Sequence, residues 1–405
     1  MGRNFRWLLG SSWISNIGDG LALASGPLLI ASQTHAPFLV ALSVLLQRLP
    51  WLLFGLHAGA LADRLDRRRL VVLVDLARAG VLAALAVTIV TGRVSIAVVL
   101  ATMFLLGTAE VFADTTTGTL LPMVVEKRDL GIGNARIMAG IITANQMVGP
   151  PIGAALFALG MAFPFVVQAV CVALGAVLIS RMRITPLPRP TEHTHVGQDI
   201  REGFRWTWGH APVRTLTLAI VTFNVTFGAA WSVLVLYSIN VLDMGEVGFG
   251  MLTSVGAVGG LFGTASYDWL ERHFSLALIM RVGLTIETLT HFALAVNTSF
   301  VVALVIMFVF GAHAFVWGTT SRTVRMRAVP TEFQGRVGSV YLVGVFGGLV
   351  VGSALGGLIA GAWGVTAPFW FAGVGSAVIL ALIWRELDHI AHADEALLAE
   401  STRQN

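Results

Sequence analysis

The sequence predicts an all-α membrane protein in which twelve transmembrane helices form two six-helix bundles. Three observations predict this class: the apolar composition, the spacing of the apolar segments and an internal repeat. Of the 405 residues, 56% are hydrophobic and only 12% are charged, and the mean hydropathy is +0.80. Because soluble chains carry about a quarter charged residues, we expect a polytopic membrane protein.

Twelve apolar segments are long enough to cross a bilayer, for which a helix needs about 20 mostly apolar residues. They cover 7–32, 38–62, 70–91, 94–121, 136–160 and 163–182, then 213–241, 247–270, 276–296, 299–324, 337–361 and 365–385. The first segment follows Arg3 and Arg6 and resembles a signal peptide. It contains Asn16 and Asp19 and lacks a small-residue cleavage site, so we interpret it as the first spanning helix.

Basic residues mark one side of the membrane. The loops after even-numbered helices hold Arg64, Arg67, Arg68, Arg69, Lys127, Arg128, Arg272, Arg325 and Arg327, whereas those after odd-numbered helices hold Arg93 alone. The positive-inside rule therefore predicts a protein of the cytoplasmic membrane with both termini in the cytoplasm.

The domain organisation follows from the longest loop, which opens with the sequence TPLPRP. We predict an N-terminal bundle within 1–182, a cytoplasmic linker at 183–212, a C-terminal bundle within 213–386 and a cytoplasmic tail at 387–405. Within the linker, apolar residues recur every four positions, at Val196, Ile200, Phe204 and Trp208. This pattern favours a helix lying on the membrane surface, and docking to a partner is the alternative.

Two sequence matches indicate an internal duplication. DRLDR at 63–67 recurs as DWLER at 268–272, an offset of 205, and FLLG at 104–107 recurs as FVFG at 308–311, an offset of 204. Since each half has an even number of helices, the halves have the same orientation in the membrane. Transporters built from such parallel repeats bind their substrate near the midplane, between the repeats.

The stretch GALADRLDRRRLV at 59–71 resembles the G-x-L-x-D-R-x-G-R-R signature of the major facilitator superfamily. The matching residues are Gly59, Leu61, Asp63, Arg64, Arg67 and Arg68. Asp66 stands where the family has glycine, and aspartate tolerates a left-handed backbone better than most residues. The resemblance covers essentially the whole chain and implies a transporter that works by alternating access.

Two further motifs narrow the resemblance. VGPPIG at 148–153 resembles the Gly-Pro motif of antiporters, with Gly149, Pro150, Pro151 and Gly153 as its defining residues. NIGDG at 16–20 and EVFADTT at 110–116 look like the bacterial drug-efflux branch that contains macrolide and siderophore exporters. The arginine that many proton-drug antiporters carry in the fourth helix is absent, and Glu110 and Asp114 occupy that helix instead.

The first motif predicts a gate on the cytoplasmic side. Gly55 and Gly59 share a helical face and would allow another helix to approach closely. We expect Asp63 to bind helix donors and nearby arginines in a contact that stabilises the outward-open state. The second copy, Asp268 and Arg272, is depleted because Thr264 replaces Gly59. The alternative is that the arginines only anchor the topology.

Rows of small residues predict close helix contacts. They are Gly149 and Gly153, Gly256 and Gly260, and the four residues Gly344, Gly348, Gly352 and Gly356. In the superfamily's arrangement the helices that carry them meet along the seam between the halves. The rows therefore predict a sliding or rocking contact, with simple packing as the alternative.

Ionisable residues at membrane depth are costly and by default functional. Asp19 lies roughly 18 Å along the first helix at 1.5 Å per residue, and Arg48 has a similar depth on the second. Glu110 and Asp114 share one face of the fourth helix, because they are four residues apart. We predict a protonatable cluster with Arg48 as counter-charge; the alternative is a permanently paired structural network.

Other polar residues carry weaker predictions. Asn16 precedes Asp19 by one turn, and Asn145 precedes the Gly-Pro motif and is expected to face the cavity. Asp75 and Arg78 are expected to pair with each other or with the gate near the cytoplasmic end of the third helix. For Glu287, His291 and His313 a structural role is expected.

Aromatic residues on the first, fourth, seventh and tenth helices predict the character of the cavity. They are Trp13, Phe112, Phe223, Phe227, Trp231, Phe315 and Trp317. Aromatic rings give large apolar contacts and attract cations, which suits amphipathic substrates. Packing and lipid contact explain such residues equally well.

The sequence as a whole predicts a proton-coupled efflux antiporter for amphipathic small molecules such as drugs. Alternatives of the same fold are a siderophore or lipid-like metabolite exporter and an uptake symporter. An enzyme is not expected, because no H-E-x-x-H motif or Ser/His/Asp grouping stands out. The expected partners are the substrate, protons and the lipid bilayer, and the protein is expected to be a monomer.

No nucleic acid is expected as a partner, because the 26 lysines and arginines lie mostly in short loops between apolar segments. Cys171 is the sole cysteine, so neither a disulfide framework nor a thiolate metal cluster is expected. We expect no metal ion and no cofactor.

Overall fold

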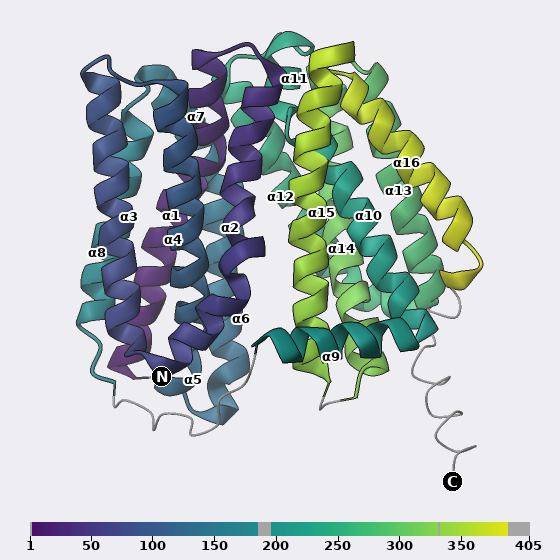
Figure 1. Cartoon of the computed structure of the whole chain (residues 1–405), viewed down its shortest axis with the longest axis horizontal. Helices are drawn as coiled ribbons and strands as arrows, with labels where there is room; N and C mark the ends of the chain where they lie inside the picture. The colour runs from purple at the N-terminus through teal and green to yellow at the C-terminus, as the bar shows by residue number, and fades with distance from the viewer. Residues whose placement is uncertain (1, 185–195, 331–332, 388–405) are drawn as a thin grey trace. The chain divides into compact units, whose positions relative to one another are not determined.

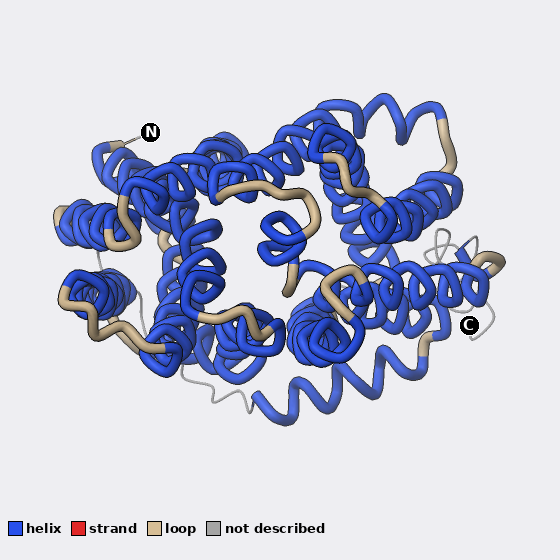
Figure 2. Tube along the Cα trace, turned by 90° about the horizontal axis from the view of Figure 1, so that it is seen from above, coloured by secondary structure: helices blue, strands red, loops and turns tan. Residues whose placement is uncertain are grey.

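The computed structural model describes residues 2–184, 196–330 and 333–387, without the side chains of Ala60, Asp63, Val196 and Asp199. All regular secondary structure in these ranges is helical (Figure 2). Eleven helical segments are long and apolar enough to cross a membrane, and a shorter apolar helix covers the 17 residues of Ala367–Ile383. The prediction of a multi-pass all-α protein is confirmed, and the twelfth spanning helix stays a prediction.

Backbone contacts divide the chain into two units. The N-terminal unit comprises Met1–His193 and Val235–Ser254, and the C-terminal unit comprises Thr194–Leu234 and Val255–Asn405. The segment Val235–Ser254 was expected within the C-terminal bundle, but its contacts group it with the N-terminal unit.

The N-terminal unit begins with four long helices. These are α1 (Arg3–Gln33), α2 (Pro37–Arg64), α3 (Arg67–Val90) and α4 (Ile96–Gly118). After α5 (Leu121–Val124) and a 3₁₀ turn at Lys127–Asp129 come α6 (Leu130–Gly140), a π-helical segment (Ile141–Val148), α7 (Gly149–Leu159) and α8 (Phe163–Ser180). Helices α1 and α3 both pack against α8 (Figure 1). The unit also holds α11 (Leu234–Asn240), apart from Leu234, and the start of α12 (Glu246–His273).

The C-terminal unit contains the rest of the described helices. They are α9 (Val196–Gly209), α10 (Ala211–Trp231), the remainder of α12, α13 (Leu276–Val296), α14 (Phe300–Ala328), α15 (Gln334–Trp363) and α16 (Ala367–Ile383). Helix α9 lies across the ends of α10 and α15 (Figure 1). Glu202 pairs with Arg336 at 3.1 Å, and Trp206 stacks on Phe333. The predicted amphipathic helix therefore exists; its contact with the membrane surface stays a prediction.

The helix boundaries repeat along the chain. Helices α4 and α14 begin 204 residues apart (300 minus 96), as do α8 and α16 (367 minus 163). The stretch from Leu130 to Leu159, which contains α6 and α7, matches the start and end of α15 with the same offset (334 minus 130, 363 minus 159). The duplication inferred from short motifs therefore extends to whole helices.

The turn between α2 and α3 needs no left-handed residue. Asp66 has φ −66° and ψ 106° and caps α3, because its carboxylate accepts a hydrogen bond from the Arg69 amide at 3.1 Å. An N-cap of this kind satisfies one free amide of the helix. The tolerance of aspartate for left-handed backbone, invoked above, is therefore irrelevant to this turn, and helix capping explains the residue.

The Gly-Pro motif forms a backbone contact with α1. A Cβ atom built on Gly149 would lie 2.5 Å from the Cα of Gly20, and one built on Gly153 would lie 2.7 Å from the Cα of Leu21. Prolines 150 and 151 pack instead on α12, where a Cβ atom on Gly250 would lie 2.9 Å from the Cα of Pro151. Glycine is required in these rows because the two backbones touch.

The other glycine rows also pack inside a single unit. In the C-terminal unit, a Cβ atom on Gly348 would lie 2.6 Å from the carbonyl oxygen of Val221 on α10. Gly352 and Gly356 continue this contact between α15 and α10, and Gly260 faces the ring of Phe315 on α14. For the glycines of these rows the interpretation as a seam between the halves was wrong, because their contacts hold each unit together. The expected meeting of the fifth and eighth spanning helices is confirmed where Gly250 of α12 lies against Pro150 and Pro151.

Replacing Gly153 by alanine tests the contact between α1 and α7. We expect Gly153→Ala to lower the free energy of unfolding by about 1–3 kcal/mol, because the added methyl group overpacks a backbone contact. Gly80→Ala is the matched control: no atom lies within 4 Å of its built Cβ atom, so alanine should stabilise α3 by roughly 0.5–1 kcal/mol. Unfolding of the purified protein in mixed micelles measures both; equal effects would contradict the assignment.

Candidate functional site

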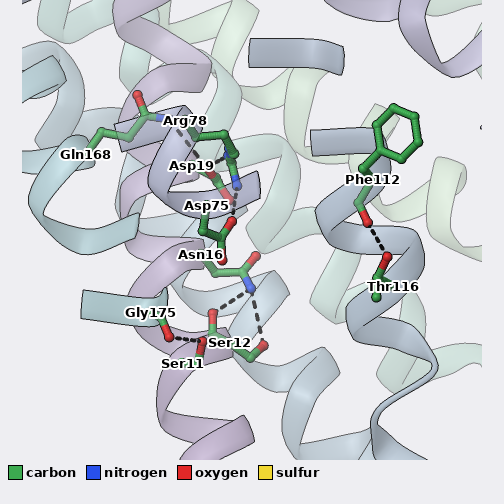
Figure 3. Close-up of polar contacts among 10 residues, drawn as sticks. All are labelled: Ser11, Ser12, Asn16, Asp19, Asp75, Arg78, Phe112, Thr116, Gln168 and Gly175. Carbon is green, nitrogen blue, oxygen red and sulfur yellow. Dashed lines mark hydrogen bonds and ion pairs between the residues drawn. The ribbon is translucent and has the colours of Figure 1, made fainter. Parts of the chain in front are cut away.

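An ion-pair network lies inside the N-terminal unit. Arg78 on α3 contacts Asp19 on α1, with Nη2 to Oδ1 at 2.5 Å, and Asp75 on its own helix, with Nη1 to Oδ1 at 3.5 Å. The Gln168 side chain on α8 donates to the same oxygen of Asp19 at 3.3 Å. Figure 3 shows the three charged side chains pointing toward one another, with the amide of Gln168 beside them. We call these four residues the Arg78 network.

The network is buried, and its helices explain why. Only 3% of the Arg78 side chain and 18% of the Asp19 side chain are exposed. Arg78 lies near the middle of α3, not near its cytoplasmic end as the sequence suggested, and α1 and α3 both pack on α8. Asp75 and Arg78 are three residues apart and therefore project from one helical face. The expected pairing of these two residues with each other is confirmed.

Glu110 and Asp114 flank this network from α4. Glu110 is half-buried and Asp114 is exposed. Charge interactions link both carboxylates to Arg78, yet neither forms a hydrogen bond or ion pair with another residue that the structure describes. The two acids are therefore held less tightly than Asp19 and Asp75.

Arg48 is not the counter-charge of Asp19. Its side chain is exposed, and within the described ranges it makes no hydrogen bond or ion pair. Its charge acts on Glu110 only at longer range. Arg48 is therefore not the ion-pair partner that the alternative of a permanently paired network required, because depth along a helix does not tell which way a side chain points. Its role as a counter-charge of the acid cluster stays a prediction.

Two polar atoms of the network lack a partner among the described residues. They are Nε of Arg78 and Oε1 of Gln168, and both are buried. Such atoms usually bind water or another polar group. Sequence reasoning missed Gln168, although a glutamine within the apolar stretch FPFVVQAVCVALG was a usable signal. No grouping of three or more His, Cys, Asp or Glu in the described ranges is arranged to hold a metal ion.

The two predicted asparagines lie near the network without joining it. The Asn16 amide donates to the backbone oxygen of Ser12 at 2.7 Å, so it is bonded within its own helix (Figure 3). Asn145 is half-buried in the π-helical segment, and its backbone oxygen would lie 2.6 Å from a Cβ atom on Gly20. The backbone of Asn145 therefore helps to position α1 one residue after Asp19.

The motif between α2 and α3 sits at one end of the N-terminal unit. Arg68 donates to the carbonyl oxygen of Met182 at 2.8 Å, and Arg67 donates to that of Ala62 at 3.2 Å. Arg64 is exposed. The side chain of Asp63 lies outside the described part of the chain, so its expected contacts stay a prediction.

Gly59 and the second copy of the motif make few contacts. Within the N-terminal unit no atom lies within 4 Å of a Cβ atom on Gly59. In the C-terminal unit Arg272 pairs with Asp268 at 3.2 Å, and both side chains are largely exposed. Exposed pairs of this kind contribute about 0.3–0.5 kcal/mol on a helix, in agreement with a depleted copy.

The predicted cavity aromatics fall into separate environments. Phe223 is 4% exposed and belongs to the hydrophobic core of the C-terminal unit, so its assignment to the cavity was wrong. Trp317 packs against the same core. Phe227 and Trp231 stack at 4.4 Å and share contacts with Phe310 on α14.

The remaining aromatics of this set lie elsewhere. Phe112 on α4 faces Phe54 on α2, with ring centroids 6.4 Å apart. Trp13 donates to the carbonyl oxygen of Arg136 at 3.2 Å, and Phe315 packs on Gly260.

Eleven membrane-capable helices, several of which recur at an offset of 204 residues, together with a charged network buried in the N-terminal unit, define a polytopic membrane transporter. More particularly, the chain belongs to the transmembrane secretion effector family of the major facilitator superfamily, whose sequence profile matches residues 2–403. The resemblance drawn from the motifs is thereby confirmed, and the protein is a transporter rather than an enzyme.

The relatives and a solved structure agree with this membership. The chain is 26% identical over 382 residues to the multidrug efflux pump Tap of Mycolicibacterium fortuitum, covering 89% of this chain and 90% of Tap. It is 26% identical over 357 residues to the putative bacilysin exporter BacE of Bacillus subtilis, covering 87% and 88%. The nucleoside transporter NupG, at 11% identity and a TM-score of 0.77 over 95% of this chain and 100% of NupG, shows the same fold.

A double-substitution experiment tests the ion pair. We expect Arg78→Gln alone to lower the free energy of unfolding by about 3–5 kcal/mol, because it leaves buried carboxylates without a cation. Combining it with Asp19→Asn should cost less than the sum of the single changes, since the two residues interact directly. Arg48→Gln should stay within about 0.5 kcal/mol. Additive effects in mixed micelles would argue against the pair.

Proposed function

We propose that this protein exports amphipathic small molecules from the cytoplasm in exchange for protons, by alternating access. Export is supported by the names of two relatives, a multidrug efflux pump and a putative exporter. Amphipathic substrates are supported by the aromatic group of Phe227, Trp231 and Phe310 in the C-terminal unit, since such rings bind apolar and cationic groups.

The proposal of proton exchange rests on the balance of charge around the Arg78 network. Four carboxylates share this region with two arginines, so full ionisation would leave more negative than positive charge at membrane depth. The carboxylates are Asp19, Asp75, Glu110 and Asp114. Uncompensated charge in a membrane is costly, and interacting acids then titrate as a group that holds shared protons.

Within this group the two loosely held acids are the best proton carriers. Asp19 and Asp75 are bonded to Arg78, which holds both carboxyl groups in place. Glu110 and Asp114 have no such bond in the described part of the chain, so their protonation can change without breaking an ion pair. We assign Asp19 and Arg78 to holding the site and Glu110 and Asp114 to loading and releasing protons.

The motif between α2 and α3 is proposed as a gate on the cytoplasmic side. Arg68 bonds the end of α8, and Asn4 near the N-terminus bonds Arg183 in the same region at 2.7 Å. Basic residues gather at this end, which by the positive-inside rule supports a cytoplasmic position for it. Asp63 is the proposed residue that makes and breaks the gating contact.

Proton coupling is tested by transport in proteoliposomes. We expect substrate-driven proton movement with a drug cation to fall at least about tenfold in Glu110→Gln, because the amide cannot carry a proton between the two sides. The matched control is Glu126→Gln, an exposed acid of the same unit, which should transport normally. Unchanged proton movement in Glu110→Gln and Asp114→Asn together would overturn the proposed coupling.

The gate is tested by the accessibility of an introduced cysteine. We expect Asp63→Asn to increase labelling from the cytoplasmic side, because loss of the charge weakens the contact that closes it. Asp268→Asn, in the exposed second copy, should change labelling little. The test uses a Cys171→Ala background, since Cys171 is the sole native cysteine. Equal labelling in the two variants would contradict the gate and would show that the motif only anchors the topology of the helices in the membrane.

A further inference from the structure

The C-terminal unit buries an acid–histidine pair that the proposed export cycle does not use. Nε2 of His313 on α14 lies 3.2 Å from Oε2 of Glu287 on α13, with side-chain exposures of 1% and 10%. Nδ1 of His313 has no hydrogen-bond partner among the described residues. A buried carboxylate and imidazole at this distance share a proton, whichever of the two formally carries it.

A second histidine lies beside this pair. His291 follows Glu287 by one helical turn and therefore shares its face of α13, and it is fully buried. Neither of its ring nitrogens has a hydrogen-bond partner in the part of the chain that the structure describes. Its ring is nearly perpendicular to that of Trp231, with centroids 5.9 Å apart at an angle of 88°. Burial opposes a positive charge on His291, Glu287 favours it and His313 opposes it.

The helices packed around this group add no competing charge near it. Helix α16 carries no ionisable side chain, and the single one on α10, Arg214, bonds to the Trp208 carbonyl near the start of that helix. On α13, Arg281 bonds to the Trp384 carbonyl at the other end of the helix from His291. The ionisable residues of α12 and the arginines of α14 lie toward the ends of those helices. One carboxylate and two imidazoles therefore form an isolated titratable group.

The group also borders an open space. A cavity of about 740 Å³ lies between α12, α13 and α14, with walls that include Phe262, Trp269 and Phe308, and His313 is one of its lining residues. His313, unlike Glu287, therefore forms part of the wall of this cavity.

We propose that Glu287, His313 and His291 form a proton-binding site of the C-terminal unit, separate from the carboxylates of the N-terminal unit. One proton lies between Oε2 of Glu287 and Nε2 of His313. A second proton enters on a ring nitrogen of His291, where the negative charge of Glu287 stabilises the imidazolium. Trp231 senses the second proton, because its ring lies next to that of His291 and a cationic imidazole quenches tryptophan fluorescence.

This site concerns equilibrium proton binding by the protein without substrate, so it does not rest on the proposed export. The test uses the purified full-length protein in detergent and protons as the only ligand. Tryptophan fluorescence is followed from about pH 8 to about pH 4, which spans the ordinary range of histidine. We expect a quenching transition on acidification that is lost in both His291→Gln and Trp231→Phe.

Two variants sharpen the assignment. In Glu287→Gln the transition should require more acid, because the charge that stabilises the imidazolium is gone. His273→Gln is the control: His273 is exposed and stacks on Trp269 at 4.9 Å, so this change should remove a different component and leave the first transition in place. Trp231→Phe gives the same answer should His291→Gln fail to fold. The proposal would be overturned if no quenching transition were lost in both His291→Gln and Trp231→Phe. It would also be overturned if the transition occurred at the same pH in Glu287→Gln as in the unchanged protein.

Discussion

The N-terminal unit depends on the burial of one positive charge. Arg78 is 97% covered in the middle of α3, and placing an arginine at the centre of a membrane helix costs about 2.5–3.5 kcal/mol even on insertion scales. Asp19 and Asp75 offset that cost by direct contact. Because they come from α1 and from α3 itself, these two helices and the α8 residue Gln168 must stay together. The network thereby gives the unit a fixed core, against which the loosely held acids of α4 can change their protonation.

Close backbone contacts make this geometry possible. Asp19 is followed by Gly20, whose Cα atom touches the Gly-Pro motif of α7 and whose position also meets the carbonyl oxygens of the π-helical segment. A π turn leaves carbonyls displaced from the regular α-helical pattern, and glycine on α1 accommodates them. The Gly-Pro motif therefore acts structurally here: it fixes the rotation of α1, and that rotation directs Asp19 toward Arg78. A substitution in the motif would disturb the charged network without touching a charged residue.

The fold and part of the site followed from the sequence. Predicted segments 94–121 and 163–182 correspond to α4 (Ile96–Gly118) and α8 (Phe163–Ser180), because apolar length and Ser or Pro at helix starts are local signals. The choice of Arg48 over Arg78 failed for a physical reason: a depth ruler gives the height of a side chain in the membrane but not its rotation about the helix axis. Phe223 was misassigned for the same reason, since one face of α10 enters the core and another does not. Packing contacts, such as those of the glycine rows, decide which helices and side chains lie next to one another. Short sequence motifs do not specify these contacts.

Comparing equivalent positions in the two copies of the duplication shows which features the two units share and which differ between them. At the 204-residue offset of the starts of α4 and α14 and of α8 and α16, Glu110 and Asp114 correspond to Ala314 and Gly318, and Gln168 corresponds to Ala372. In the other direction His313 corresponds to Ala109. The helices were therefore kept in both copies, while the ionisable side chains on α4 and α14 and the glutamine of α8 differ between them. Ionisable groups inside a membrane bundle are costly and generally pair with one another, so an arginine such as Arg78 is retained together with the carboxylates that contact it. The Arg78 network and the Glu287–His313 pair are two independent solutions to that requirement on one backbone plan.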